Sequence, residues 1–263
     1  MTDRPQTQDS RRLWLIDALL AERTEYAHIE IPEDAESQRR LLRALFNVRP
    51  PEPASDEFLA VQDAYLQERT REKGVTHLAE LACLQPQLYL WQGDITTLEV
   101  DGIVNSANSQ MLGCFAPNHG CIDNAIHTFA GVQLRLACAQ MMAAQAHEEP
   151  TGQAKITPGF NLPAAHVLHT VGPIVGWQGV TPRDRLALAS CYRSCLELAD
   201  AHGLSSLAFC CISTGEFHYP NDQAARVAIE TVRQYLRETE STLEVVFNVF
   251  KPVDYQLYLD LLG

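Results

Sequence analysis

Apolar residues in the first 80 positions recur every three or four residues, which is the spacing of one face of an α-helix. Two such stripes are Leu13, Leu15, Ile16, Leu19 and Leu20, followed by Leu41, Leu42, Leu45 and Phe46. The proline-rich residues 49–53 end the second helix, Ser55 offers an N-cap for a third, and Gly74 marks its end. No run typical of a β-strand occurs before Leu88. Residues 1–82 are therefore predicted to form an all-helical N-terminal extension.

The pattern changes after Gln85, where short runs of apolar and β-branched residues alternate with longer helical stretches. The predicted strands are 88–91, 102–104, 166–171, 207–212 and 243–249, and the predicted helices are 122–143, 183–202, 221–238 and 253–262. Alternating strands and helices predict an α/β fold with a mostly parallel sheet and helices on both faces. Residues 83–263 are expected to form this domain, with ligands bound at the carboxyl ends of the strands.

The charge composition limits the classes of molecule that the protein is expected to bind. The 263 residues include 20 Lys plus Arg against 33 Asp plus Glu, a formal net charge of −13. This balance argues against nucleic acid, whose phosphates need a basic surface, and against an anionic membrane surface. Neither Lys nor Arg occurs in residues 92–131 or 212–225, so a small anion bound there is expected to meet backbone N–H groups.

Cysteine usage and the N-terminus favour a cytoplasmic location. Eight cysteines in a chain of this length are too sparse for a disulfide scaffold. Residues 1–12 are polar and charged, and the apolar stretch that follows is interrupted by Asp17, so no signal peptide is predicted. No segment has the ~20 consecutive apolar residues of a membrane span.

Cys114, His119 and Cys121 form a C-x4-H-x-C motif in a segment that glycine and proline mark as a loop. Two thiolates and one imidazole at this spacing suit zinc. Three protein ligands leave a fourth coordination position open, as in catalytic zinc sites. We therefore predict a zinc site here; the alternative is unrelated cysteine and histidine side chains that share a tight loop.

Asp123 follows this motif at the start of a predicted helix, and His127 lies one turn later on the same face. A first-turn Asp commonly caps a helix, but beside a metal it could orient or deprotonate a reacting hydroxyl group. The residues alone leave both roles open. His127 is expected to be a hydrogen-bonded histidine behind the metal ligands, and Cys191 and Cys195 are expected in the core.

Two further loops follow predicted strands. The Gly93-Asp94 pair comes after the first strand, where a carboxylate can accept hydrogen bonds from an exocyclic amine. Ser213, Thr214 and Gly215 precede a predicted helix, and small residues with free N–H groups form an anion site there. Gly-Asp by itself is a common turn dipeptide, so the order of the loops along the chain says more about function than either loop alone.

Taken in order, these loops resemble the macrodomain family, whose members bind ADP-ribose on a three-layer α/β/α fold. The segments that carry the resemblance are 93–95, 105–108, 123–127, 152–163, 169–173 and 213–217. Common macrodomain hydrolases have a glycine run just before the Asp, and residues 114–121 stand in its place here. With the helical extension, this is similar to the zinc-dependent microbial class of the family.

The resemblance implies a role for each matching position. Asp94 is expected to contact the adenine amine with the Ile95 N–H beside it, Asn108 to reach the distal ribose, and Phe250 to pack on adenine. The backbone around the diphosphate is expected to come from Ser213, Thr214, Gly215, Glu216 and Phe217, with Phe217 also covering the ribose. Glu216 stands where many relatives have a small or apolar residue, so its carboxylate is expected to point away from the phosphates.

The resemblance also implies an activity: a zinc-dependent hydrolase that removes mono-ADP-ribose from protein side chains, with Asp or Glu esters as the expected linkage. Asp123 would assist proton transfer, and Asn108 would hold the ribose hydroxyls. Members of this class often act beside a sirtuin-type ADP-ribosyltransferase and a lipoyl-carrier protein. Two alternatives are a non-catalytic ADP-ribose reader and a deacetylase of O-acetyl-ADP-ribose.

Overall fold

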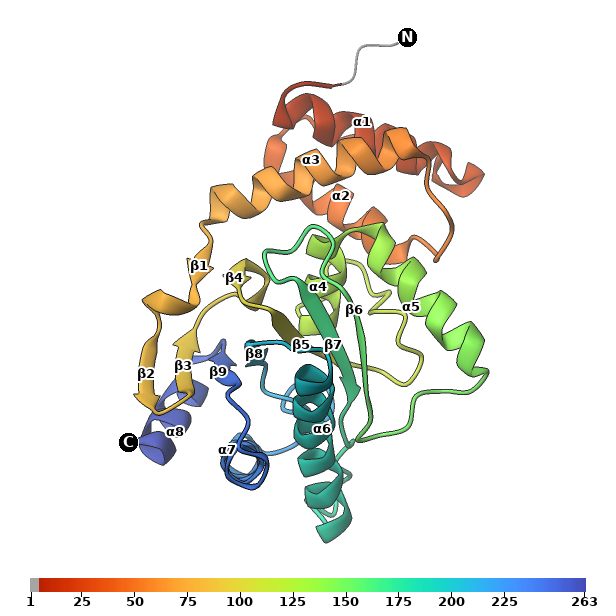
Figure 1. Ribbon diagram of the computed structural model, residues 1–263. Helices are drawn as coiled ribbons and strands as arrows, with labels where there is room; N and C mark the ends of the chain where they lie inside the picture. The colour runs from red at the N-terminus through yellow and green to blue at the C-terminus, as the bar shows by residue number, and fades with distance from the viewer. Residues whose placement is uncertain (1–4) are drawn as a thin grey trace.

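The computed structural model describes residues 5–263, and its centre is a seven-stranded sheet (Figure 1). In spatial order the strands are β2 (Ala82–Gln85), β3 (Leu88–Gln92), β9 (Glu244–Val249), β8 (Ser206–Phe209), β5 (Gly102–Ala107), β7 (His166–Val171) and β6 (Ala154–Pro158). The five inner strands are parallel, and β2 and β6 pair antiparallel at the two edges. The predicted mixed, mostly parallel sheet is confirmed.

Helices cover both faces of this sheet, as predicted (Figure 1). On one face lie α4 (Ile122–Ala130), which contacts β5, and α5 (Val132–Gln145), which contacts β6. On the other lie α6 (Pro182–Ala201), α7 (Asn221–Thr239) and α8 (Pro252–Leu262). Successive residues of β5 such as Ile103 and Val104 are fully buried, because a parallel strand between two helical layers is shielded on both sides. None of the helices among residues 5–263 is long and apolar enough to cross a membrane.

The N-terminal extension has a separate apolar core formed by α1 (Gln8–Ala21), α2 (Ala35–Val48) and α3 (Asp56–Lys73). The predicted cap of α3 is confirmed, since the Ser55 side chain accepts a hydrogen bond from the Phe58 N–H, and Gly74 follows the last helical residue. Short 3-10 turns occur at η1 (Thr24–Tyr26), η2 (Leu78–Glu80) and η3 (Ile95–Thr97). The bundle lies over one end of the α/β domain, with α2 and α3 against α4 (Figure 1).

Three local predictions were wrong, and one strand was missed. Strands do occur before Leu88: β1 (Thr76–His77) pairs with β4 (Leu98–Glu99), and β2 pairs with β3 after a turn at Gln87. Their own sequence does not predict them: β2, for example, is a half-exposed edge strand without apolar alternation, so only its pairing identifies it as a strand. The helix predicted over 122–143 is two helices separated at Gly131. The strand predicted over 207–212 ends at Phe209. The missed strand is β6.

Candidate functional site

Three loops that carry the predicted site residues lie at the carboxyl ends of β3, β5 and β8, inner strands of the sheet that run parallel. Carboxyl ends of parallel strands meet at one edge of the sheet, so the loops are brought together by topology. We call residues 108–121, after β5, the cysteine loop, and residues 213–217, after β8, the Ser213 loop. Their contact is direct, because Glu216 Oε1 lies 3.6 Å from His119 Nε2.

The cysteine loop brings its three predicted metal ligands together. One ligand atom from each of Cys114, His119 and Cys121 lies within 4.8 Å of the others. His119 Nδ1 is buried and has no hydrogen-bond partner, while its other ring nitrogen faces the Glu216 carboxylate. Histidines that bind metals commonly donate the second ring N–H to a carboxylate. The donor set, its spacing and the unpartnered Nδ1 therefore fit a zinc ion.

Cys121 also begins helix α4. Its Sγ accepts a hydrogen bond from the Asn124 N–H at 3.4 Å, so the N-cap of this helix is Cys121 and not Asp123. Burial, with a contribution from the nearby Cys114 and Asp123, raises the pKa of the Cys121 thiol to about 12, although the hydrogen bond from the Asn124 N–H lowers it. A thiolate here needs a cation close by, which is what a bound metal provides.

Asp123 is buried beneath the cysteine loop in a polar network. Asn105 Nδ2 donates to its Oδ1 at 2.8 Å, and His127 Nε2 lies 3.5 Å from the same oxygen. Burial raises the pKa of Asp123 to about 6, although the Asn105 hydrogen bond and the charge of Arg135 lower it. A carboxyl group whose pKa lies near neutrality can both accept and return a proton.

His127 differs from its prediction. Both ring nitrogens are buried without a hydrogen-bond partner, so this histidine is not the satisfied one that the helix pattern suggested. Its neighbour His169 is satisfied on both sides, by Asn105 Nδ2 at 3.2 Å and Thr157 Oγ1 at 2.9 Å. Burial lowers the pKa of His169 to about 4, so the ring is neutral. Cys138 lies beside these rings in the core.

Asn108 is engaged within the cysteine loop. Its Oδ1 accepts from the Gln110 N–H at 3.0 Å, and its Nδ2 donates to the Gly113 carbonyl at 3.3 Å. The amide therefore holds the first turn of the loop. The orientation of the Asn108 amide is therefore already fixed before any ribose hydroxyl would bind to it.

The Ser213 loop has an unusual supply of free donors. Among the described residues, the backbone N–H groups of Gly215, Glu216 and Phe217 have no hydrogen-bond partner. Ser213 has a left-handed backbone (φ 65°), and its buried Oγ is also unpartnered. Helix α7 follows, and no side chain caps its N-terminus. Consecutive free N–H groups beside a helix N-terminus form a concave site for an anion such as a phosphate.

At the other end of the site, Asp94 is held by the extension. Its Oδ1 accepts from the Thr96 N–H and hydroxyl, and its Oδ2 lies 2.7 Å from Lys73 Nζ, at the end of α3. Ile95 is buried in the core, and Phe250 is 75% exposed just beyond β9. An exposed phenyl ring can stack on a planar ligand without any change in the packing of the core.

The sequence did not predict Lys73 or Arg43 in this region, because both come from the extension. Arg43 Nη2 donates to the His119 carbonyl at 3.0 Å and to Asn124 Oδ1 at 2.8 Å. No motif links these positions, which are 76 and 81 residues apart in the chain. Only the packing of α2 and α3 on α4 brings them to the site.

Known proteins are similar to this chain in sequence. Residues 104–228 match the family model described as Macro domain. A Treponema medium protein named "Protein-ADP-ribose hydrolase" is 54% identical over 261 residues, which are 98% of this chain and 100% of that protein. A Fusarium oxysporum f. sp. cubense protein named "Probable bifunctional ADP-ribose hydrolase/ADP-ribosyltransferase" is 41% identical over 249 residues, 86% of this chain and 41% of that longer one.

A solved structure agrees with these matches. The Trypanosoma brucei macrodomain in complex with ADP-ribose gives a TM-score of 0.65 at 31% identity, covering 84% of this chain and 95% of that chain. The family model, the full-length relative and the shared fold lead to one conclusion: this chain belongs to the macrodomain family.

Proposed function

We propose that the protein is a hydrolase that removes mono-ADP-ribose from modified protein side chains. The observation that carries the proposal is the row of three unpartnered N–H groups at residues 215–217, which contacts the cysteine loop through Glu216 and His119, with the buried carboxyl of Asp123 just after that loop in the chain. The name of the Treponema medium relative, protein-ADP-ribose hydrolase, supports it at 54% identity.

In this proposal the diphosphate binds to the Ser213 loop through backbone donors. Thr214 Oγ1 is already bonded to the Cys211 carbonyl at 2.9 Å, so the side chain shapes the loop while the N–H groups of Gly215, Glu216 and Phe217 face the ligand. Residues 212–225 contain no Lys or Arg, so backbone dipoles are the local source of positive charge. Asp94 and Phe250 bind the adenine, and Phe217 covers the ribose.

Catalysis in this proposal combines Asp123 with a zinc ion held by Cys114, His119 and Cys121. When bound, zinc supplies Lewis-acid polarisation of an oxygen near the anomeric carbon of the distal ribose. Asp123 accepts a proton from the attacking hydroxyl or water and returns it to the leaving oxygen, as its raised pKa permits. Asn108 fixes the ribose hydroxyls.

The substrate we propose is an Asp or Glu ester of ADP-ribose, with a lipoyl-carrier protein as the modified protein. Its modification would come from a sirtuin-type ADP-ribosyltransferase. The Fusarium oxysporum relative supports such a pairing, because its name joins a hydrolase to an ADP-ribosyltransferase. We place the protein in the cytoplasm, which is consistent with eight cysteines that are all unpaired.

The test separates metal chemistry from nucleotide binding. Cys121→Ser removes a thiolate ligand but keeps an oxygen that can cap α4, and Cys83→Ser on strand β2 is the matched control. We expect Cys121→Ser to lower the rate of ADP-ribose release from a mono-ADP-ribosylated protein by at least about 100-fold. Affinity for free ADP-ribose, measured by calorimetry, should change by less than about threefold, since the Ser213 loop is intact.

Three results would count against parts of this proposal. Undiminished release by Cys121→Ser would exclude the metal role. Tight binding of ADP-ribose by the wild-type protein without any release from modified protein would indicate a reader. Faster hydrolysis of O-acetyl-ADP-ribose than of the modified protein would indicate the deacetylase.

A further inference from the structure

The N-terminal extension touches the candidate site through helix α2, which packs on α4 beside the cysteine loop. Figure 1 shows the bundle of α1, α2 and α3 above the end of the domain where α4 begins. A helical bundle with its own core does not need polar contacts to a distant loop to be stable. The residues that make such contacts therefore need an explanation.

Arg43 on α2 makes a forked contact with the start of α4. Its Nε and Nη2 donate to Asn124 Oδ1 at 3.2 and 2.8 Å, and Nη2 also donates to the His119 carbonyl at 3.0 Å. Asn124 in turn donates from Nδ2 to the Ala116 and Cys114 carbonyls at 3.0 and 3.4 Å, and from its N–H to Cys121 Sγ at 3.4 Å. Arg43 and Asn124 together contact all three predicted metal ligands.

Asn47, one turn further along α2, adds a second contact. It is 1% exposed, its Oδ1 accepts from the Asn118 N–H at 2.9 Å, and its Nδ2 donates to Thr128 Oγ1 at 2.9 Å. Asn118 immediately precedes His119 and has a left-handed backbone (φ 55°). Asn47 therefore fixes the backbone at Asn118, the residue just before His119.

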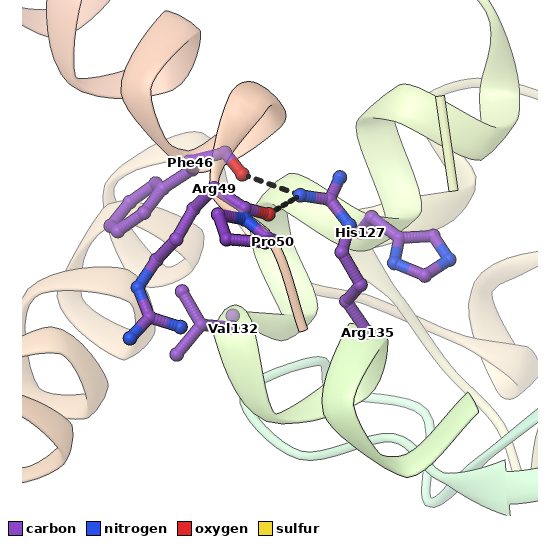
Figure 2. Close-up of a pocket in the computed structure, with 7 residues that line it drawn as sticks. Phe46, Arg49, Pro50, His127, Val132 and Arg135 are labelled. Carbon is purple, nitrogen blue, oxygen red and sulfur yellow. Dashed lines mark hydrogen bonds between the residues drawn. The ribbon is translucent and has the colours of Figure 1, made fainter. Parts of the chain in front are cut away.

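Arg135 on α5 links the cysteine loop to the end of α2. Its Nε donates to the Leu112 carbonyl at 2.8 Å, its guanidinium lies 4.3 Å from the centre of the Phe115 ring, and Nη1 bonds to the Phe46 and Arg49 carbonyls at the end of α2 (Figure 2). The cavity beside these residues is about 10 Å³, room for a single water molecule, so the junction is closely packed.

We propose that Arg43 and Asn47 are positioning residues, through which helix α2 of the extension holds the cysteine loop in the conformation that binds zinc. The inference rests on the proposed function, because it requires the metal. Residues 108–121 have no helix or strand of their own. Ordering a free loop costs conformational entropy at the moment of binding, and a loop ordered in advance binds its ligand more tightly. The extension supplies that order.

The experiment uses the full-length chain, stripped of metal and titrated with zinc against a chromophoric chelator. Arg43→Ala is the test variant, and Arg40→Ala is its control, because Arg40 is on the same helix, is exposed and has no partner in the part of the chain that the structure describes. We expect the zinc dissociation constant of Arg43→Ala to rise by about tenfold or more, and that of Arg40→Ala to stay within about twofold. Arg43→Lys, which keeps the charge but loses the fork, should fall between them.

A purely structural role would lower the thermal midpoint of Arg43→Ala without changing its zinc affinity. Zinc affinities of Arg43→Ala and Arg43→Lys equal to that of the wild type would therefore overturn the inference while leaving the proposed function intact. If Arg43→Ala does not fold, the affinity of Arg43→Lys decides. Failure of the wild-type chain to bind zinc would overturn the metal part of the proposed function and this inference with it.

Discussion

The two loops that face each other across the candidate site are held in different ways. The Ser213 loop is short and is shaped mainly by backbone hydrogen bonds between residues close in the chain: the Thr214 and His218 N–H groups close turns at its two ends, and the Tyr219 N–H donates to the Ser213 carbonyl. The cysteine loop is longer, and side chains from α2, α4 and α5 hold it. One loop is built locally, and the other depends on partners that are distant in the chain.

This difference matches the two tasks that we propose for the loops. A backbone anion site needs only a strand, a turn and a helix N-terminus, which adjacent residues provide. A three-residue metal site needs its donor atoms within a few ångströms of each other, and a loop of irregular structure keeps them there only if other elements hold it. Replacing a closely packed glycine in or beside one loop should therefore affect the binding of only one ligand.

The largest effect is expected at Gly113, in the cysteine loop. Its φ is 80°, and an added Cβ would lie 2.7 Å from Cγ of the buried His127 ring. We expect Gly113→Ala to lower the free energy of unfolding by about 2 kcal/mol and to weaken zinc binding more than about tenfold. Chemical denaturation and zinc titration measure the two effects. The control is Gly120→Ala in the same loop, where an added Cβ meets nothing within 4 Å. Equal behaviour of the two variants would contradict the prediction.

The reciprocal change is Gly172→Ala, beside the Ser213 loop. An added Cβ would lie 2.0 Å from Ser213 Oγ and 2.9 Å from Ile212 Cγ2, so the side chains at the start of the Ser213 loop must shift. We expect ADP-ribose affinity to fall by about tenfold, or ~1.4 kcal/mol, with zinc affinity unchanged. Gly176→Ala, which meets nothing within 4 Å, is the matched control for calorimetry. A parallel loss of zinc affinity would show that the two loops are not independent.

A smaller effect is expected at Phe250, at the adenine end. The side chain is 75% exposed, so its removal costs the core little, but a base that stacks on it would lose that contact. Phe250→Ala should weaken ADP-ribose binding by about fivefold, near 1 kcal/mol, and leave the thermal midpoint unchanged. Leu186→Ala, another exposed apolar side chain, serves as the control. Unaltered affinity in Phe250→Ala would remove this residue from the adenine site.

The smallest effect is expected at Glu216, where the two loops meet. Its carboxylate lies 3.6 Å from His119 Nε2 but is 70% exposed, so water weakens the interaction. Glu216→Gln should weaken zinc binding by about threefold and leave ADP-ribose affinity unchanged, because the backbone N–H remains. Glu197→Gln on the exposed side of α6 controls for the lost charge. A loss of ADP-ribose affinity instead would mean that the carboxylate faces the nucleotide.

Much of the fold could be predicted from the sequence, because it depends on local regularities. Apolar periodicity predicted the three helices of the extension and the five inner strands, and Ser55 and Gly74 marked the ends of α3 correctly. The edge strands β2 and β6 were not predicted, because their own apolar pattern does not indicate their pairing with β3 and β7. Continuous apolar spacing across Gly131 likewise concealed the break between α4 and α5.

The sequence by itself determined the candidates for chemistry: the spacing of Cys114, His119 and Cys121, the acid that follows them, and two segments without Lys or Arg. Only the tertiary structure decided how those residues are held. The cations that contact the first of these segments, residues 92–131, come from elsewhere in the chain: Arg43 and Lys73 of the extension contact the cysteine loop and Asp94, and Arg135 of α5 contacts Leu112. A ligand motif is local in the chain, but the position of each donor atom depends on contacts between elements many residues apart, and folding alone creates those contacts.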